Sequence, residues 1–380
     1  MLVEIIENFM EKAKVSMNIK VLHTAECIGG VDRYLRCLLK YSTCENIAIL
    51  SQLYNEEDYK KLADHVEIMH MSHGMGFSAV KEALELRKKI KKYNPDIVYA
   101  HSSIAGAITR MACVGLKVKV VYNPHGWSFN MEGGKKKVVV FLEKIMSQFC
   151  NAIVCISEAE KISALREKIC RDDKLHVIYN GIDIEGYEKK KAELQVPEDA
   201  FVVGMVGRIC RQKAPDVFVR MAGEVQKQIK NAYFVIVGDV IEGAAEERIE
   251  IEDLATELGV KLIITGWVNS PLDYMARFDV GCLLSRWEGF GLVIPEYMLT
   301  GTPVVATRVD AIPYLIRNDA NGCLVEMDDW NAAAQKVVEL ANDREMRTRL
   351  IGNGKKTVRE RFDVRRVAEQ TEELFVELEK

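Results

Sequence analysis

Short apolar runs alternate with stretches of helical periodicity along most of the chain. In the first half each run ends in polar residues or glycine, and apolar residues at spacings of three and four follow it. This alternation predicts parallel strands joined by helices, with polar side chains gathered at the carboxyl edge of the sheet. The strands expected in this half are Ile19–Thr24, Ile47–Leu50, Val66–Met71, Ile97–Ala100, Val118–Tyr122, Ile153–Ile156 and Val177–Tyr179.

The same pattern restarts after a lysine-rich stretch, Glu188–Lys191, which is typical of a linker. It predicts an α/β protein with two doubly wound parallel sheets, one domain over residues 1–187 and a second over residues 188–364. Helical stretches Ala332–Ala341 and Val367–Leu378 end the chain. The strands expected in the second half are Val202–Val206, Tyr233–Val237, Leu262–Thr265, Val280–Leu284, Pro303–Thr307 and Gly322–Val325.

The composition agrees with two folded cores of ordinary size. The chain has 380 residues, of which 48% are hydrophobic, and single cores stop growing well below that length. No apolar run approaches the ~20 residues that cross a bilayer, and the acidic start is not that of a secretory signal. Ten cysteines contain no Cys-x-x-Cys pair, which indicates reduced thiols in a cytosolic protein and disfavours structural zinc.

The charge is unevenly distributed along the chain. Residues 1–184 carry 26 basic against 22 acidic side chains, residues 185–380 carry 26 against 34, and residues 101–150 alone carry 7 against 2. The plain interpretation is a solvated surface. The alternative is that the first half faces an acidic membrane surface or a lipid-phosphate acceptor. Residues 1–16 have apolar positions at helical spacing, which fits either a cap on the first domain or an interfacial helix.

The stretch Ser285–Glu296 has the strongest chemical signal. A strand leads into two glycines and then into a helix, an order that presents backbone N–H groups to an anion. Glu288 and Glu296 stand at the two ends of this glycine loop. Their separation suits a long ligand with hydroxylated parts on either side of a phosphate.

Two other patterns are rejected as sites. Gly74–Ala79 formally matches Gly-x-Gly-x-x-Ala, but the next strand ends in His101 and not in the acidic residue of a nicotinamide-binding fingerprint. His70 and His73 lie where the chain is strand-like and then a loop, so they are interpreted as structural. With no Asp-x-Asp in the sequence, no essential metal is expected.

Several motifs occur in an order that resembles a known family. They are Glu288-x7-Glu296, Gly207-Arg208 with Lys213, Gly301–Val305, Gly29–Val31, His125-Gly126 and Asn180–Asp183. The chain resembles the retaining GT-B glycosyltransferases of the family-four type, which use nucleotide sugars. The resemblance implies two Rossmann-like domains facing across a cleft, with the donor on the second and the acceptor mainly on the first. It also implies that the last helix, residues 365–380, packs back on the first domain.

The resemblance assigns the cations to the leaving group. Arg208 and Lys213 are expected to neutralise the departing diphosphate, the arginine bidentately, with help from the backbone N–H groups of Phe290, Gly291 and Leu292. The plain alternative for the two cations is surface charge at the end of a strand. Many members have glycine after the lysine, whereas this chain has alanine and then proline.

The remaining roles follow from the same resemblance. Glu288 is expected to accept hydrogen bonds from sugar hydroxyls, and Glu296 from the ribose, unless Glu296 only complements its helix dipole. The loop of Gly266, Trp267 and Val268 is expected to recognise the base.

In the first domain, Gly29 and Gly30 are expected to approach the donor phosphates, and His125 to lie beside the transferring sugar. An ordinary turn and a structural histidine are the alternatives. No carboxylate has the position of a covalent nucleophile, so retention through attack on the leaving-group side is the expected course.

The favoured function is transfer of a hexosyl group, from a UDP-sugar by family frequency, to a glycan or lipid-linked acceptor in polysaccharide or glycolipid synthesis. Such an enzyme would be cytoplasmic, peripheral on the inner face of the membrane, and would have no nucleic-acid partner and no cofactor besides its donor. The alternatives are a small-molecule acceptor, a non-catalytic nucleotide-sugar-binding subunit, and a sugar-nucleotide epimerase.

Overall fold

The computed structural model describes residues 18–52, 56–72, 77–130, 136–241 and 243–380. The chain divides into two compact units, the first running to Asp183 and including Asp363–Lys380, the second spanning Ile184–Phe362. The amphipathic stretch 1–16 and the residues His73 to Gly76 of the rejected patterns lie outside the described residues.

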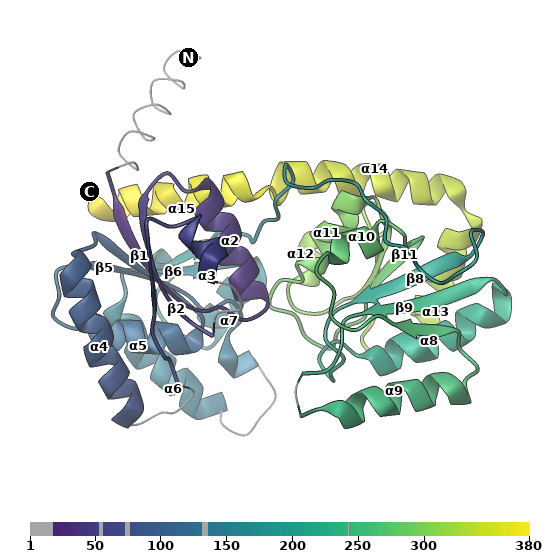
Figure 1. Ribbon diagram of the computed structural model, residues 1–380, viewed down its shortest axis with the longest axis horizontal. Coiled ribbons are helices and arrows are strands. Elements are labelled where there is room, and N and C mark those ends of the chain that lie inside the picture. Colours follow the sequence, from purple (N-terminus) through teal and green to yellow (C-terminus); the bar gives the residue numbers. More distant parts are fainter. Residues whose placement is uncertain (1–17, 53–55, 73–76, 131–135, 242) are drawn as a thin grey trace, which may run out of the picture. The chain divides into compact units, whose positions relative to one another are not determined.

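The first unit is built on a seven-stranded parallel sheet with strand order β3-β2-β1-β4-β5-β6-β7 (Figure 1). The order reverses between β1 and β4, which is where doubly wound sheets bind their ligands. The strands are β1 (Lys20–Glu26), β2 (Glu45–Ser51), β3 (His65–Ile68), β4 (Ile97–His101), β5 (Lys119–Asn123), β6 (Ala152–Cys155) and β7 (Leu175–Val177).

Helices cover both faces of this sheet (Figure 1). On one face α2 and α15 pack over Val21, Ile97 and Val121, and on the other α4, α5, α6 and α7 pack over alternate residues such as Leu22 and Val98. This alternation is the two-residue period of a strand buried on both sides. The helices are α2 (Gly30–Tyr41), α3 (Glu56–Lys60), α4 (Phe77–Tyr93), α5 (Ser103–Cys113), α6 (Lys136–Met146), α7 (Glu158–Arg166) and α15 (Val364–Glu379), with 3-10 turns at Ser128–Asn130, Ser147–Phe149 and Asp172–Lys174.

The second unit has a six-stranded parallel sheet with strand order β10-β9-β8-β11-β12-β13. Its order reverses between β8 and β11. The strands are β8 (Phe201–Val206), β9 (Ala232–Val237), β10 (Leu262–Ile264), β11 (Val280–Leu283), β12 (Val304–Thr307) and β13 (Cys323–Val325). The helices are α8 (Pro215–Gln228), α9 (Ala245–Glu257), α10 (Pro271–Met275), α11 (Val293–Thr300), α12 (Ile312–Leu315), α13 (Trp330–Asn342) and α14 (Arg344–Arg361).

A glycine places α11 close against its sheet. A Cβ at Gly281 of β11 would lie 2.7 Å from the ring of Tyr297 on α11, a separation that carbon atoms do not tolerate. The ring is fully buried, and its hydroxyl lies 3.4 Å from the backbone carbonyl oxygens of Gly204 and Cys282. The start of α11, and with it the glycine loop, is therefore held by packing on β11.

The predicted class of fold, two doubly wound parallel sheets, is confirmed. The predicted position of the last strand of the first sheet is wrong by two residues, because β7 is Leu175–Val177 and not Val177–Tyr179. Beyond Val177 the pairing ends with the bond from the Ile178 amide to the Cys155 carbonyl. Across the described helices, none combines the length and the apolar character that crossing a membrane would require.

Candidate functional site

The ends of β8 and β11 bring two predicted residues together. Lys213 lies in the loop between β8 and α8, Glu288 in the loop between β11 and α11, and the Nζ atom of Lys213 forms an ion pair with Oε1 of Glu288. The side chains of both residues are mostly buried, 15% and 6% exposed. Because β8 and β11 flank the reversal of strand order, this pair stands where such sheets bind ligands.

Two residues that the sequence analysis did not single out orient Glu288. The hydroxyl of Ser285 donates to Oε1 of Glu288 at 2.8 Å, and the backbone N–H of Glu288 donates to Oδ2 of Asp310 at 2.8 Å. Ser285 is three residues before Glu288, so its position in the motif was a signal. Asp310 comes from the loop after β12, and no local pattern connects it to Glu288.

The lysine loop departs from the family pattern at a strained position. Ala214 has a left-handed backbone, with φ 51° and ψ 54°, which costs an alanine about 1 kcal/mol relative to glycine. Pro215 follows as the first residue of α8, where a missing N–H is harmless. The presence of Ala214 and Pro215, where many family members have glycine after the lysine, therefore leaves the charge of Lys213 in the loop.

Arg208 is joined to the same loops through Gln212. Its Nη2 atom lies 3.4 Å from Oε1 of Gln212, and Nε2 of Gln212 donates to the carbonyl of Trp287 at 3.1 Å. The Arg208 side chain is exposed. Because the contact with Gln212 is long, the guanidinium can turn toward an anion without breaking a strong ion pair.

Arg286, unlike Arg208, is held by ion pairs with two carboxylates. It binds both carboxylate oxygens of Asp216, at 2.6 and 3.1 Å, and Oδ1 of Asp328 at 2.9 Å. The hydrogen bond to Asp216 is the main reason that the pKa of Arg286 is raised. This arginine ties the glycine loop to α8 and to the segment before α13.

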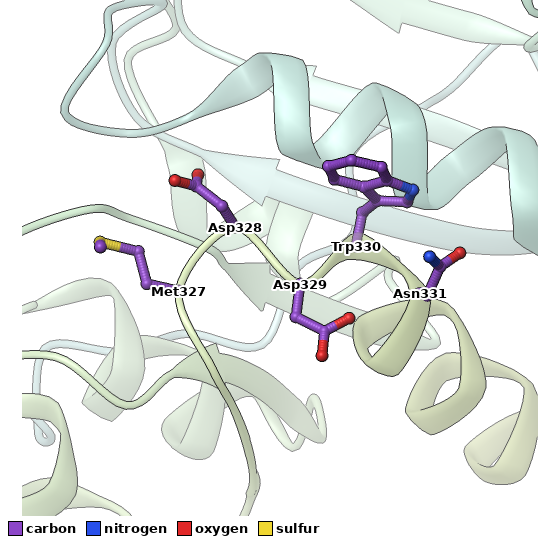
Figure 2. Close-up of a pocket in the computed structure, with 5 residues that line it drawn as sticks. All are labelled: Met327, Asp328, Asp329, Trp330 and Asn331. Atoms are coloured by element: carbon purple, nitrogen blue, oxygen red, sulfur yellow. The ribbon is translucent and has the colours of Figure 1, made fainter.

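The described residues that line the hollow at the start of α13 include no such pair of a lysine with a carboxylate. Figure 2 shows it lined by residues 327–331. Its acids are engaged, Asp328 with Arg286 and Asp329 with the Ala332 amide that it caps. Trp330 lies under the guanidinium of Arg220.

The rest of the glycine loop surrounds the start of α11. Gly291 has φ 85°, and a Cβ there would approach Leu283 to 3.3 Å. Phe290 is buried, Leu292 precedes the first helical residue, and Glu296 in the first turn is 1% exposed. The backbone N–H groups at this helix start carry partial positive charge that suits an anion.

The base-recognition candidates lie at the edge of the second sheet. Gly266, Trp267 and Val268 follow β10, and Gly266 has φ 74° beside the carboxylate of Asp239. The Trp267 side chain is 63% exposed. An exposed indole of this kind offers a flat surface for stacking.

The candidates of the first unit lie at the ends of β1 and β5. Gly29 has φ 57° directly before Gly30 begins α2, and no atom of the described residues lies within 4 Å of the position that a Cβ of residue 29 would take. Glycine is therefore favoured at this position by the positive φ of the backbone and not by a lack of space for a side chain. His125 follows β5 with φ 50°, a strained conformation that is common at functional sites.

His125 is the end of a row of hydrogen-bonded side chains that sequence reasoning missed. Its Nε2 lies 3.2 Å from Nδ1 of His101, Nε2 of His101 lies 3.2 Å from Nδ1 of His23, and Nε2 of His23 lies 3.0 Å from Oδ1 of Asn46. Burial lowers the pKa of all three histidines, that of His23 to about 4. The three rings are therefore neutral at pH 7.

Glu160 supports the loop that carries His125. The Trp127 indole donates to the Glu160 carbonyl at 3.0 Å, and the Glu160 carboxylate accepts from the Ile156 amide at 2.8 Å. Burial raises the pKa of this carboxyl from 4.5 to about 8. At pH 7 the folded protein therefore keeps a proton on Glu160 that the unfolded chain has lost.

This proton predicts a stability that falls as the pH rises from 4.5 to 8, because the unfolded state binds fewer protons there. The contribution of Glu160 is roughly 3–5 kcal/mol over that range. Urea unfolding of the wild type and of Glu160→Gln at both ends of the range measures it. The difference between the two proteins isolates Glu160, since the histidines are common to both. Equal pH slopes would contradict the raised pKa.

The structure thus places Lys213, Glu288, Phe290, Gly291, Leu292, Glu296, Arg208, Gly266, Trp267 and Val268 in the second unit, and Gly29, Gly30 and His125 in the first. An ion pair joins Lys213 to Glu288, and Arg208 contacts Gln212, which donates to the carbonyl of Trp287 next to Glu288.

Comparison with known proteins matches both halves of the chain. Residues 186–357 match the family described as glycosyl transferases group 1, and residues 28–185 match glycosyltransferase family 4. An uncharacterized 41.2 kDa protein in the cps region of Klebsiella pneumoniae is 31% identical over 338 residues, covering 84% of this chain and 88% of that protein.

A named relative and a solved structure are also similar. UDP-Gal:alpha-D-GlcNAc-diphosphoundecaprenol alpha-1,3-galactosyltransferase of Escherichia coli is 28% identical, covering 79% of this chain and 80% of that one. The crystal structure of Anabaena Alr3699/HepE in complex with UDP and glucose superposes with a TM-score of 0.79 at 22% identity, covering 94% of this chain and all of that one. At 22% identity, the similarity to the Anabaena structure concerns the fold alone.

Proposed function

The chain belongs to the GT-B glycosyltransferases of the family-four type, and we propose that it moves a hexosyl group from a UDP-sugar to a glycan or lipid-linked acceptor in polysaccharide or glycolipid synthesis. The observation that carries this proposal is the ion pair of Lys213 with Glu288 at the reversal point of the second sheet. A cation and a carboxylate side by side match a donor in which a diphosphate adjoins a hydroxylated ring. The Escherichia coli relative, named for a diphosphoundecaprenol acceptor, supports the lipid-linked class.

Donor binding exchanges the partners of this pair. The ammonium of Lys213 turns to the diphosphate, and Glu288 accepts hydrogen bonds from sugar hydroxyls while Ser285 keeps its bond to Oε1. Each buried charge then has a new partner when it loses the old one, which avoids the large cost of a buried charge left alone.

The other residues of the second unit complete the donor site. Arg208 adds a second cation, and the N–H groups of Phe290, Gly291 and Leu292 bind the diphosphate oxygens. Glu296 accepts from the ribose hydroxyls.

The edge of the second sheet holds the base. The uracil stacks on the exposed indole of Trp267, with Gly266 and Val268 shaping the same loop. With protein cations at the diphosphate, the donor needs no metal ion.

The transfer proceeds with retention on the leaving-group side. The bond from the anomeric carbon to the phosphate oxygen breaks, the acceptor oxygen bonds to that carbon on the same face, and the acceptor proton passes to the departing phosphate. Charge grows on the diphosphate as the bond breaks, so fixed cations stabilise the transition state more than the ground state.

The first unit supplies the acceptor side in this proposal. Gly29 and Gly30 bring backbone close to the donor phosphates, and His125 contacts the transferred sugar. A lipid-linked acceptor places the enzyme in the cytoplasm, peripheral on the inner face of the membrane.

Donor turnover tests the proposed function directly. The purified protein is incubated with a panel of UDP- and GDP-sugars, and release of the nucleotide diphosphate is followed with and without lipid-linked oligosaccharide. One UDP-sugar should be consumed, and Glu288→Gln should not consume it. Binding without turnover for every donor would favour the non-catalytic subunit, and a β-linked product from an α-linked donor, seen by NMR, would refute retention.

A further inference from the structure

Helix α6 turns a row of large apolar side chains outward. Val138, Phe141 and Ile145, with Phe149 just past the helix, are 52%, 61%, 43% and 42% exposed. Positions three and four residues apart lie on one side of a helix, while Glu143 lies on the buried side. These four apolar side chains are called the α6 ridge below.

The exposed charges on helix α6 itself are positive. The helix carries Lys136, Lys137 and Lys144, and its one acidic residue, Glu143, is buried and paired inside the unit. Lys136 forms an ion pair with Glu167 at 2.9 Å, whereas Lys137 and Lys144 stand in the helix next to Val138 and Ile145 of the α6 ridge. Apolar side chains bordered by lysines, with no exposed acid on the helix, are the pattern of helices that lie in the plane of a bilayer surface.

We propose that the α6 ridge docks the first unit on an anionic lipid bilayer. The apolar side chains enter the boundary between headgroups and acyl chains, and the lysines bind lipid phosphates. An exposed apolar surface of this kind needs a partner, and the positive border selects one with negative charge. The excess of basic over acidic residues in the range 101–150 is thereby assigned, in part, to the lysines of one helix that binds lipid. This proposal does not depend on the proposed donor chemistry.

Vesicle binding tests the α6 ridge by comparing the same change, isoleucine to serine, on the ridge and on a control helix. Ile145→Ser removes an exposed isoleucine from the α6 ridge, while Ile249→Ser removes one, 55% exposed, from the acidic helix α9. On vesicles of equal parts phosphatidylglycerol and phosphatidylcholine, we expect Ile145→Ser to weaken binding roughly tenfold and Ile249→Ser to leave it unchanged. Lys137→Ser with Lys144→Ser should remove the preference over pure phosphatidylcholine.

Donor hydrolysis in solution should be the same in all these variants, so a loss of vesicle binding is distinguishable from a loss of the transferase site. Equal effects of the two isoleucine changes, or no binding to either vesicle, would overturn the proposal. A concentration-dependent dimer abolished by Ile145→Ser would also overturn it, because a second copy would then be the partner.

An independent observation concerns the row of side chains that ends at His125. Asn46 stands on β2, His23 on β1, His101 at the end of β4, and His125 after β5. These four strands are neighbours in that order. The row therefore crosses the first sheet one strand at a time.

The direction of the hydrogen bonds is set at Asn46. Its amide Nδ2 donates to the Cys44 carbonyl at 2.8 Å, so Oδ1 is the atom that faces Nε2 of His23. An amide oxygen only accepts, so the hydrogen of the neutral His23 ring is on Nε2 and its Nδ1 is bare. By the same rule His101 donates from Nε2 and accepts at Nδ1, and His125 donates from Nε2.

We infer that Asn46, His23 and His101 are positioning residues that keep Nδ1 of His125 as a hydrogen-bond acceptor. The inference rests on the proposed function, because a bare nitrogen suits a hydroxyl of the transferred sugar. Tyr34 holds the ring edge-on at 4.7 Å between centroids. The opposite tautomer would place an N–H there, which can bind a hydroxyl only through the oxygen.

Nitrogen NMR of the ligand-free protein tests the inference without any donor. In the wild type, Nδ1 of His125 should have the shift of a bare nitrogen and Nε2 that of an N–H. Asn46→Leu should mix the two tautomers at His125, two histidines away, and lower donor turnover roughly 5- to 10-fold. A protonated Nδ1 in the wild type, or an unchanged His125 spectrum in Asn46→Leu, would overturn it.

Discussion

Replacing Lys213 by alanine is expected to lower donor turnover by roughly 10²- to 10³-fold. The ammonium lies in a mostly buried site against Glu288, where a fixed charge stabilises a growing negative charge far more than it would in water. Its loss removes this stabilisation from the departing diphosphate, and it leaves Glu288 with the Ser285 hydroxyl and without a cation. The turnover number measures the effect, since the interaction strengthens as the bond to phosphate breaks.

A matched control is available in the same unit. Lys227 on α8 forms an exposed ion pair with Glu224 at 2.7 Å, its side chain 69% exposed, and such pairs contribute little. Lys227→Ala should therefore turn over the donor at the wild-type rate. Lys213→Arg should recover part of the loss, because it restores the charge with a different shape. A Lys213→Ala enzyme within twofold of the wild type would remove this lysine from the leaving-group role.

Replacing Glu143 by leucine is expected to lower the free energy of unfolding by roughly 3–5 kcal/mol. Glu143 accepts from Nη1 of Arg110 at 2.8 Å and from the Tyr122 hydroxyl at 3.2 Å. Arg110 is 1% exposed, and its guanidinium lies 3.9 Å from the centre of the Tyr122 ring. Without the carboxylate, a buried guanidinium loses its counter-charge. Urea denaturation followed by circular dichroism measures the change.

The double variant separates the charge from the packing. Arg110→Met with Glu143→Leu replaces the pair by apolar side chains of similar size, which is often neutral or stabilising for a buried pair. Most of the lost stability should therefore return. If the double variant is as unstable as Glu143→Leu alone, the packing of α6 on α5, and not the unpaired charge, accounts for the loss.

The fold could be predicted because its signals are local. Runs such as Ile97–Ala100 and Val202–Val206 are apolar on both faces, and each is followed by turn residues and a helix, so the period of the pattern identifies the element. The errors lie at element ends, as at β7, where one hydrogen bond decides whether a residue belongs to the strand. Helix α15 illustrates another limit. Its apolar positions predict a helix, but only packing reveals that it covers the same face of the first sheet as α2.

The candidate site could be predicted where its residues belong to one short motif. Glu288, Gly291 and Glu296 were found because a strand, a glycine loop and a helix follow each other within twelve residues. Ser285 could have been found by the same reasoning, whereas Asp310 could not. The roles of Glu296, Trp267 and His125 remain predictions.

The sequence by itself determined two doubly wound domains and the loops that carry their chemistry, because strand and helix periods and turn residues act over a few positions. Only the tertiary structure decided which of those loops meet. Lys213 and Glu288 are 75 residues apart and touch because β8 lies beside β11. His23 and His101, 78 residues apart, touch because β1 lies beside β4. Strand order is set by the packing of the whole domain, so these partners had no signature in any single stretch of sequence.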